Sequence, residues 1–212
     1  MKAEIIAQRI RTEIQKRSRG RDSFVIGIDG YAGSGKTTVA NLIGAHSKNV
    51  LIVHLDDFIE HWEKRKEMID IAEDKAGVFE YQWYRYVDVC RLIRSFIAKK
   101  KESVALKVYD YNKNEFGPKK DFDLSKKILV INGIFLFHPE HHLNELFDMK
   151  IYLDVDFAKA DKRRIAREKK LWGKDYIPEN HPDNWTRYFK QAYRRYVKQY
   201  RPKENADLVF KV

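Results

Sequence analysis

The stretch Gly30-Tyr31-Ala32-Gly33-Ser34-Gly35-Lys36-Thr37, followed by Thr38, decides how the rest of the chain is interpreted. It fits the pattern G-x-x-x-x-G-K-[ST] at every position. Glycines let the backbone curl so that successive N–H groups point at an anion. The lysine reaches the outer phosphates of a nucleotide, and the threonine hydroxyl can hold Mg²⁺. We name Gly30–Thr37 the phosphate loop and expect ATP contacts from Gly30, Ala32, Gly33, Ser34, Gly35, Lys36, Thr37 and Thr38.

The flanks of the phosphate loop supply the context that this motif requires. Residues 24–29 are an apolar run typical of a buried strand, and residues 37–46 have the composition of a helix. A helix that starts at the loop adds unpaired N–H groups and the positive end of its dipole. The alternative is a glycine turn that merely joins two elements. Strand, glycine-rich turn and helix together favour the phosphate site.

The amino-acid composition limits the classes of protein to which this chain can belong. The chain has 212 residues, of which 43% are hydrophobic and 34% charged, so we expect one globular domain over residues 1–212. No apolar run approaches the roughly 20 residues of a membrane span, and the charged N-terminus lacks the pattern of a signal peptide. The one cysteine, Cys90, cannot form an internal disulfide. It favours a reducing cytoplasm and a buried, inert thiol.

The net charge of +11 suits an anionic partner. A phosphorylated small molecule and a nucleic acid both fit that description. We favour the small molecule, because the phosphate loop already accounts for part of the positive charge and no nucleic-acid motif is present. Neither a membrane nor a nucleic acid is expected as a partner, and a homo-oligomer is left open.

Apolar runs alternate with helical patterns along the chain, which predicts an α/β fold with a mostly parallel sheet. A charged segment at 59–76 is expected to be a helix or lid, and 104–122 a strand followed by a turn or hairpin. An N-terminal helix lies within 1–20. The expected strands are 24–29, 50–55, 128–131, 150–154 and 208–210, and the expected helices are 3–16, 37–46, 83–98, 157–170 and 185–200.

Polar residues follow the strands that run beside the phosphate loop. Asp56 and Asp57 end the second strand, and Asn132 ends the strand at 128–131. Ligands bind beyond the carboxyl ends of a parallel sheet, so these side chains should converge on one crevice. A carboxylate there can take the proton of an attacking hydroxyl. An aspartate can also simply cap the next helix, but a cap needs only one acid, so the pair favours chemistry.

Two further polar groups have competing interpretations. Arg163 and Arg167 share a helix face with Arg164 beside them, which suits either charge stabilisation at phosphates or a solvated basic face. A second basic stretch at 194–201 is interleaved with tyrosines, and we expect a packed aromatic stripe with a solvated side. His138, His141 and His142 lack the spacing of a metal site, so we expect surface histidines.

Taken together, these motifs resemble the uridine kinase family. That group of P-loop kinases also includes nicotinamide riboside kinase, phosphoribulokinase and one type of pantothenate kinase. The resemblance runs from about residue 24 to residue 212. It is carried, in order, by IGIDGYAGSGKTT, HLDDF, VFEYQW, KVYDY, ILVINGIFLF, FDMKIYLDVD, ADKRRIARE and ADLVF.

The resemblance implies a P-loop NTPase three-layer sandwich with a five-stranded parallel core, a hairpin insertion at 104–122 and an arginine-rich lid at 157–182. It implies an ATP- and Mg²⁺-dependent kinase that phosphorylates a primary hydroxyl of a small molecule, with uridine as the first candidate. The implied roles are catalysis by Asp56, Lys36, Arg163 and Arg167, ATP contact by Arg164, acceptor binding by Asp56, Glu80, Tyr109 and Tyr111, and metal binding by Thr37, Asp57 and Asn132.

This sequence departs from the family pattern at two positions. The family usually has an acid before Gly133 that helps to hold hydrated Mg²⁺, where this chain has Asn132. Glu80 is one methylene longer than the aspartate that nucleoside kinases place on the ribose hydroxyls. Three alternatives stay open. The first is a kinase of the same family with another acceptor (a riboside, pantothenate or a sugar phosphate). The second is a nucleotide-binding regulatory protein that has lost catalysis, which Asn132 favours, and the third is a nucleic-acid-binding NTPase, which only the net charge supports.

Overall fold

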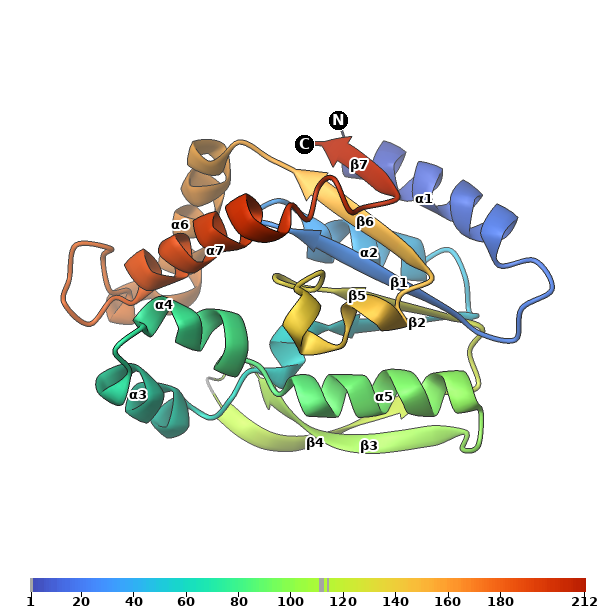
Figure 1. Ribbon diagram of the computed structural model, residues 1–212, viewed down its shortest axis with the longest axis horizontal. Helices are drawn as coiled ribbons and strands as arrows, with labels where there is room; N and C mark the ends of the chain where they lie inside the picture. Colours follow the sequence, from blue (N-terminus) through green and yellow to red (C-terminus); the bar gives the residue numbers. More distant parts are fainter. Residues whose placement is uncertain (1, 111–112, 114) are drawn as a thin grey trace.

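The computed structural model describes residues 2–110, 113 and 115–212. Its strands are β1 Phe24–Gly30, β2 Val50–His54, β3 Ser103–Asp110, β4 Glu115–Asp123, β5 Ile128–Asn132, β6 Met149–Asp154 and β7 Leu208–Lys211. Five of them form one parallel sheet in the order β2-β5-β1-β6-β7, while β3 and β4 form a separate antiparallel hairpin (Figure 1). The predicted α/β class with a five-stranded parallel core is confirmed.

The helices connect these strands and cover the sheet. They are α1 Ala3–Arg17, α2 Lys36–Gly44, α3 Trp62–Ile71, α4 Lys75–Gly77, α5 Tyr86–Ala98, α6 Phe157–Trp172 and α7 Thr186–Tyr200. Short turns of 3₁₀-helix span Leu55–Phe58, Pro139–His141, Asn144–Leu146 and Gly173–Asp175, and one π-helical turn spans Val78–Gln82. Helix α5 begins three residues later than its apolar pattern predicts, because Tyr84 forms a β-bridge with Ile59 just before the helix. Within the described part of the chain, no helix is long and apolar enough to cross a membrane.

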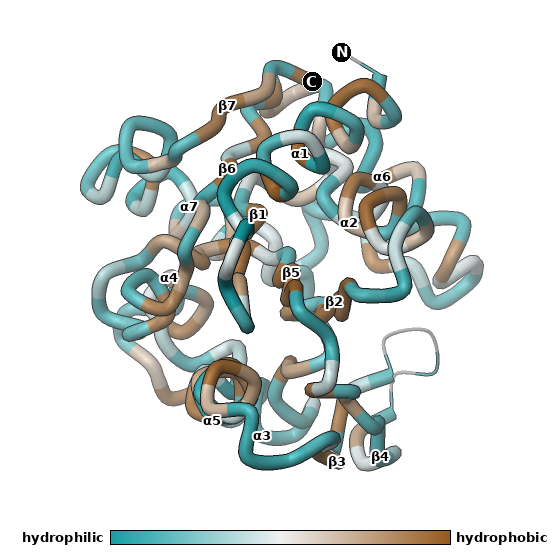
Figure 2. Tube along the Cα trace, turned by 90° about the vertical axis from the view of Figure 1, so that its right-hand side faces the viewer, coloured by the Kyte–Doolittle hydropathy of each residue, from teal (hydrophilic) through white to brown (hydrophobic). Residues whose placement is uncertain are grey.

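The strands of the sheet are buried on both faces, so their side chains alternate between two cores. In β1, Phe24 and Ile26 pack with α1 and α2, whereas Val25 packs with α5 and the hairpin. Figure 2 shows α5 and the β3–β4 hairpin on the side of the sheet away from α1. Gly27 lets Phe137 and Phe147 approach β1, since a Cβ there would lie 2.9 Å from the Phe137 ring. This close packing fixes the sheet that carries the phosphate loop.

A third core lies beyond the carboxyl ends of the strands, where Figure 1 shows α3, α4, α6 and α7 together. It joins Tyr31 of the phosphate loop to Phe189, Tyr193 and Tyr196 of α7. Tyr193 and Tyr196 are fully buried, which confirms the predicted aromatic stripe. The stripe attaches α7 to the strand ends, so both lie around one crevice.

Candidate active site

The phosphate loop has the backbone that its glycines predict. Gly33 and Gly35 have φ angles of 83° and 92°, which L side chains rarely adopt, and α2 begins directly after Gly35. A Cβ on Gly33 would also collide with the backbone carbonyl of Ala160 in α6. The Ser34 hydroxyl is buried and, among the described residues, has no hydrogen-bond partner. An unpartnered donor in a curled loop at a helix N-terminus fits a phosphate group.

Lys36 lies inside this loop and is only 8% exposed. Its ammonium donates to the carbonyl oxygens of Gly30 at 2.7 Å and Tyr31 at 2.9 Å. Burial lowers the pKa of Lys36 to about 8. The carboxylates of Asp29 and Asp56 oppose this decrease in pKa, and the positive charge of Arg167 adds to it. The structure therefore brings Lys36, Asp56 and Arg167, three residues predicted to be catalytic, within electrostatic reach of one another.

Asn132 lies between the phosphate loop and β2. Its Nδ2 donates to the Thr37 hydroxyl at 3.4 Å, and its Oδ1 lies 2.6 Å from His54 Nδ1. His54 and Asn132 are register partners at the carboxyl ends of β2 and β5. The orientation of the amide and the tautomer of His54 follow from this hydrogen-bond network. The predicted metal residues Thr37 and Asn132 thus lie together, and His54, which the sequence did not single out, holds Asn132 in place.

The two aspartates after β2 point to different partners. Asp56 is exposed, receives a long hydrogen bond of 3.5 Å from Tyr84 and acts electrostatically on Lys36. Asp57 forms an ion pair of 2.7 Å with Lys120 of β4. The structure thus directs Asp57 to the hairpin rather than to Thr37. Within the described residues, no group of three His, Cys, Asp or Glu side chains could hold a metal ion. Metal binding by Asp57 stays a prediction.

The arginines of α6 separate into two kinds. Arg163 and Arg167 are exposed, whereas Arg164 is 4% exposed and bonds to three carboxylates. These belong to Asp161 at 3.3 Å, Glu168 at 2.7 Å and Glu179. Although burial alone lowers the pKa of Arg164, the carboxylates raise it above its ordinary value. Arg164 therefore ties α6 to the segment before α7, and its predicted contact with ATP would require those ion pairs to open.

Two of the residues predicted to bind the acceptor, Glu80 and Tyr109, contact arginines. Glu80 is fully buried, and both of its oxygens accept from Arg195 Nε, at 2.9 and 3.1 Å. Arg195 also pairs with Asp74 at 2.7 Å, so it is not on a solvated side of α7 as expected. Tyr109 is 4% exposed, and its hydroxyl accepts from Arg65 at 3.1 Å. Tyr111 lies outside the described residues.

A buried acid that sequence reasoning missed lies directly before the phosphate loop. Asp29 has no exposed surface and accepts from the Tyr196 hydroxyl at 2.6 Å. Burial raises the pKa of Asp29, while the Tyr196 hydroxyl and the charge of Lys36 lower it. The signal was present in the sequence, because an acid at the end of an apolar strand must find a partner when buried. Asp29 links the loop to α7.

The expectation of surface histidines is wrong for two of the three. His138 is fully buried and His141 is 6% exposed. His138 packs against Tyr196 and Tyr200, and the ring of His141 stacks on Tyr86 with centroids 3.7 Å apart. Burial lowers the pKa of His138 to about 4 and that of His141 to about 3, so both rings are neutral at physiological pH. The histidine spacing alone could not reveal these aromatic partners.

Comparisons with known proteins agree with this geometry. Residues 25–212 match the phosphoribulokinase / uridine kinase family. The uridine kinase of Schizosaccharomyces pombe is 26% identical over 178 residues, which cover 82% of this chain and 37% of that protein. The uridine kinase of Borrelia duttonii is 25% identical over 186 residues, which cover 87% of this chain and 84% of that protein. The chain thus spans little more than a third of the first relative and most of the second.

Solved structures show the same fold. A protein named as a possible uridine kinase from Bacillus stearothermophilus aligns with a TM-score of 0.66 at 20% identity, over 95% of this chain and 99% of that one. Phosphoribulokinase from Rhodobacter spheroides aligns with a TM-score of 0.62 at 14% identity, over 90% of this chain and 70% of that one. With a family match over residues 25–212 and the phosphate loop built as described, the chain belongs to the phosphoribulokinase / uridine kinase family.

Proposed function

We propose that this protein is an ATP-dependent kinase that transfers the γ-phosphoryl group to a primary hydroxyl of a small molecule. The observation that carries the proposal is the grouping of Asp56 and Arg167 around Lys36 at the phosphate loop. Together these residues supply the parts that phosphoryl transfer needs: a cradle for the nucleotide, cations for its charge and a base for the acceptor.

Each residue has one task in the proposed reaction. Lys36 moves its hydrogen bonds from the loop carbonyls to the outer phosphates. Asp56 accepts the proton of the acceptor hydroxyl as its oxygen bonds to the γ-phosphorus. The bond from that phosphorus to the ADP oxygen breaks, and Arg163 and Arg167 stabilise the charge that develops. When bound with ATP, Mg²⁺ neutralises phosphate charge. The hydroxyl of Thr37 would hold it, next to Asn132.

A nucleoside such as uridine is the first candidate for the acceptor, because the curated relatives include proteins named uridine kinase. A second candidate is an acceptor without a ribose diol. It is favoured by the Glu80–Arg195 ion pair, which engages the carboxylate expected to bind the ribose hydroxyls. The single buried cysteine suits our proposal of a reducing cytoplasm as the working compartment.

The decisive experiment measures ADP formation with separate acceptors: nucleosides, nicotinamide riboside, pantothenate and sugar phosphates. ADP formed with one acceptor and lost in the Asp56→Asn variant supports the proposal and identifies the substrate. If ATP binds but no acceptor yields ADP at any Mg²⁺ concentration, the protein is a nucleotide-binding regulator instead. Binding to RNA or DNA that weakens steeply with added salt would support the nucleic-acid alternative.

A further inference from the structure

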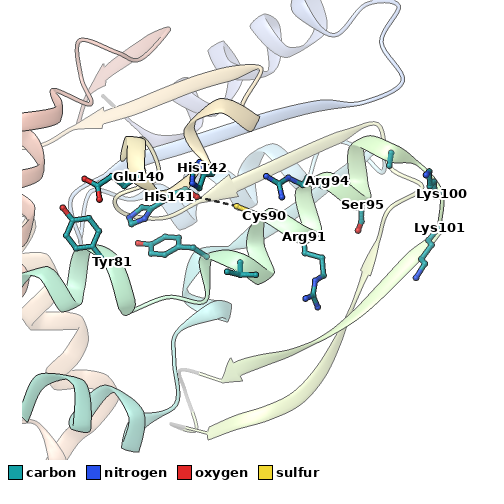
Figure 3. A pocket seen from close by; sticks show the side chains of 13 residues that line it. Tyr81, Cys90, Arg91, Arg94, Ser95, Lys100, Lys101, Glu140, His141 and His142 are labelled. Carbon is teal, nitrogen blue, oxygen red and sulfur yellow. Dashed lines mark hydrogen bonds between the residues drawn. The ribbon is translucent and has the colours of Figure 1, made fainter. Parts of the chain in front are cut away.

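A second concave site lies along α5, apart from the phosphate loop and the α6 arginines. It is a groove of about 680 Å³ between α5 and the turn at 139–142. Figure 3 shows Tyr81 and His141 toward one end of this groove, Cys90 near its middle, and Lys100 and Lys101 at the other end. With a rise of 1.5 Å per helical residue, the part of α5 from Cys90 to Ala98 is roughly 12 Å long, and the two lysines lie beyond it. The groove is therefore long enough for a molecule the size of a nucleotide.

The walls of this groove are basic. Arg91, Arg94, Lys100 and Lys101 line it, against a single acid, Glu140. In the described part of the chain, Arg94 and both lysines form no ion pair, and Arg91 reaches Asp88 only at 4.0 Å. The lysines follow the C-terminal end of α5, where the helix dipole is negative. Attraction of an anion to that end therefore depends on the lysine side chains themselves.

The inner end of the groove is formed by the ring of His141. His141 is 6% exposed and lines the groove. The ring is held in place by its stack on Tyr86. The neighbouring Cys90 thiol donates to the His141 carbonyl oxygen at 3.6 Å. The inner end of the groove is therefore a fixed aromatic surface.

We propose that this groove is a second binding site, for a phosphate-bearing small molecule of nucleotide size. The phosphate chain lies along Arg94, Lys100 and Lys101, and the uncharged part of the ligand packs at the other end against the rings of Tyr86 and His141. Charged guanidinium and ammonium groups bind phosphate oxygens strongly, and the aromatic floor of Tyr86 and His141 accommodates the uncharged part. No residue of this site belongs to the proposed transfer machinery.

Cys90 makes this proposal directly testable, because it is the only cysteine of the chain and it lines the groove. The experiment measures the rate of Cys90 modification by a small uncharged thiol reagent, in EDTA, with UTP, tripolyphosphate or uridine as the probe. At a UTP concentration ten times its Kd, we expect modification to slow about tenfold, since only the empty groove reacts. If tripolyphosphate protects Cys90 as well as UTP does, the phosphate chain is the only part of the ligand that the groove recognises.

Two variants that each lose two positive charges distinguish ligand binding in this groove from indirect effects of ligand binding at the phosphate loop. In Arg94→Ala/Lys101→Ala, we expect UTP to give little protection. In Lys16→Ala/Arg19→Ala, which removes the same charge from an exposed part of α1 and its end, protection should persist. Equal protection in both variants, protection by uridine as strong as by UTP, or no protection by either phosphate probe would overturn the proposal. The readout needs no phosphoryl transfer, so it is independent of the proposed kinase activity.

Discussion

His54 Nδ1 and Asn132 Oδ1 lie 2.6 Å apart, across two neighbouring parallel strands at the edge of the sheet that faces the phosphate loop. This contact orients the amide so that its nitrogen, not its oxygen, points to the Thr37 hydroxyl. At the position where the family resemblance predicts an acid, this chain therefore presents a neutral donor. The negative charge available to Mg²⁺ at this position is correspondingly smaller.

We expect Asn132→Glu to lower the Mg²⁺ concentration that gives half-maximal rate at saturating ATP. The new carboxylate adds charge beside Thr37, and hard cations such as Mg²⁺ favour carboxylate oxygens. Asn132→Gln is the control, because it adds the same methylene without the charge. A midpoint in Asn132→Glu that is unchanged or raised relative to Asn132→Gln would show that position 132 does not act on the metal.

Lys36 should make ATP binding dependent on pH. Burial lowers its pKa to about 8, so the ammonium is charged below pH 8 and loses its proton above it. Bound phosphates favour the charged form. Affinity should therefore be full below pH 8 and fall by up to about tenfold per pH unit above it. Calorimetry in buffers of different ionisation enthalpy would detect the proton taken up on binding. Lys36→Met should remove both this pH dependence and phosphoryl transfer while keeping the circular dichroism spectrum.

Asp56→Asn should lower turnover by about 10² or more, the scale of a lost general base, with ATP binding retained. Asp57→Asn should have a smaller effect, because its carboxylate pairs with Lys120 on the hairpin. Turnover and ATP affinity measured side by side on the two variants provide the comparison. A larger loss in Asp57→Asn would mean that the two roles are reversed.

The arginines of α6 should divide into two classes. Arg164→Ala should reduce the free energy of unfolding by about 3 kcal/mol, because it removes a buried cation and leaves three partly buried carboxylates without it. Arg163→Ala and Arg167→Ala should keep stability and reduce turnover more than ATP affinity. Arg194→Ala, at an exposed position of α7, is the control. If substitutions at positions 163, 167 and 194 all have equally small effects on turnover, Arg163 and Arg167 belong to a solvated basic face and take no part in phosphoryl transfer.

Glu80→Gln should lower stability by roughly 1–3 kcal/mol, the range for a disrupted buried hydrogen bond, and leave the KM of the acceptor unchanged. The reason is that Glu80 bonds to Arg195 in the fold. Glu73→Gln removes an exposed acid nearby and should leave both quantities unaltered. A raised KM of the acceptor with unaltered thermal stability would mean that Glu80 binds the acceptor, and it would contradict a structural role of Glu80 in the contact with α7.

Local patterns were sufficient for the sheet and the phosphate loop. The apolar run at 24–29 became β1, and the glycine spacing predicted a curled loop before α2, because both depend on neighbours in sequence. The ion pair of Glu80 with Arg195 joins residues 115 positions apart, and no periodicity reveals such a pair. Likewise, His141 is buried because Tyr86 on another element stacks against it. Pairings of this kind arise only when the chain packs.

The contact of Gly33 with Ala160 determines how α6 can move. Because the loop and the helix leave no room for a methyl group at this contact, we infer that a rotation of α6 would pivot there. Along the axis of α6, Arg163 and Arg167 lie roughly 5 and 10 Å from Ala160, the pivot point. A rotation of about 15° would carry Arg167 some 3 Å but Arg163 only about 1 Å. The two arginines would therefore move by unequal distances. Arg167 would approach the phosphate loop, while Arg163 would stay almost in place.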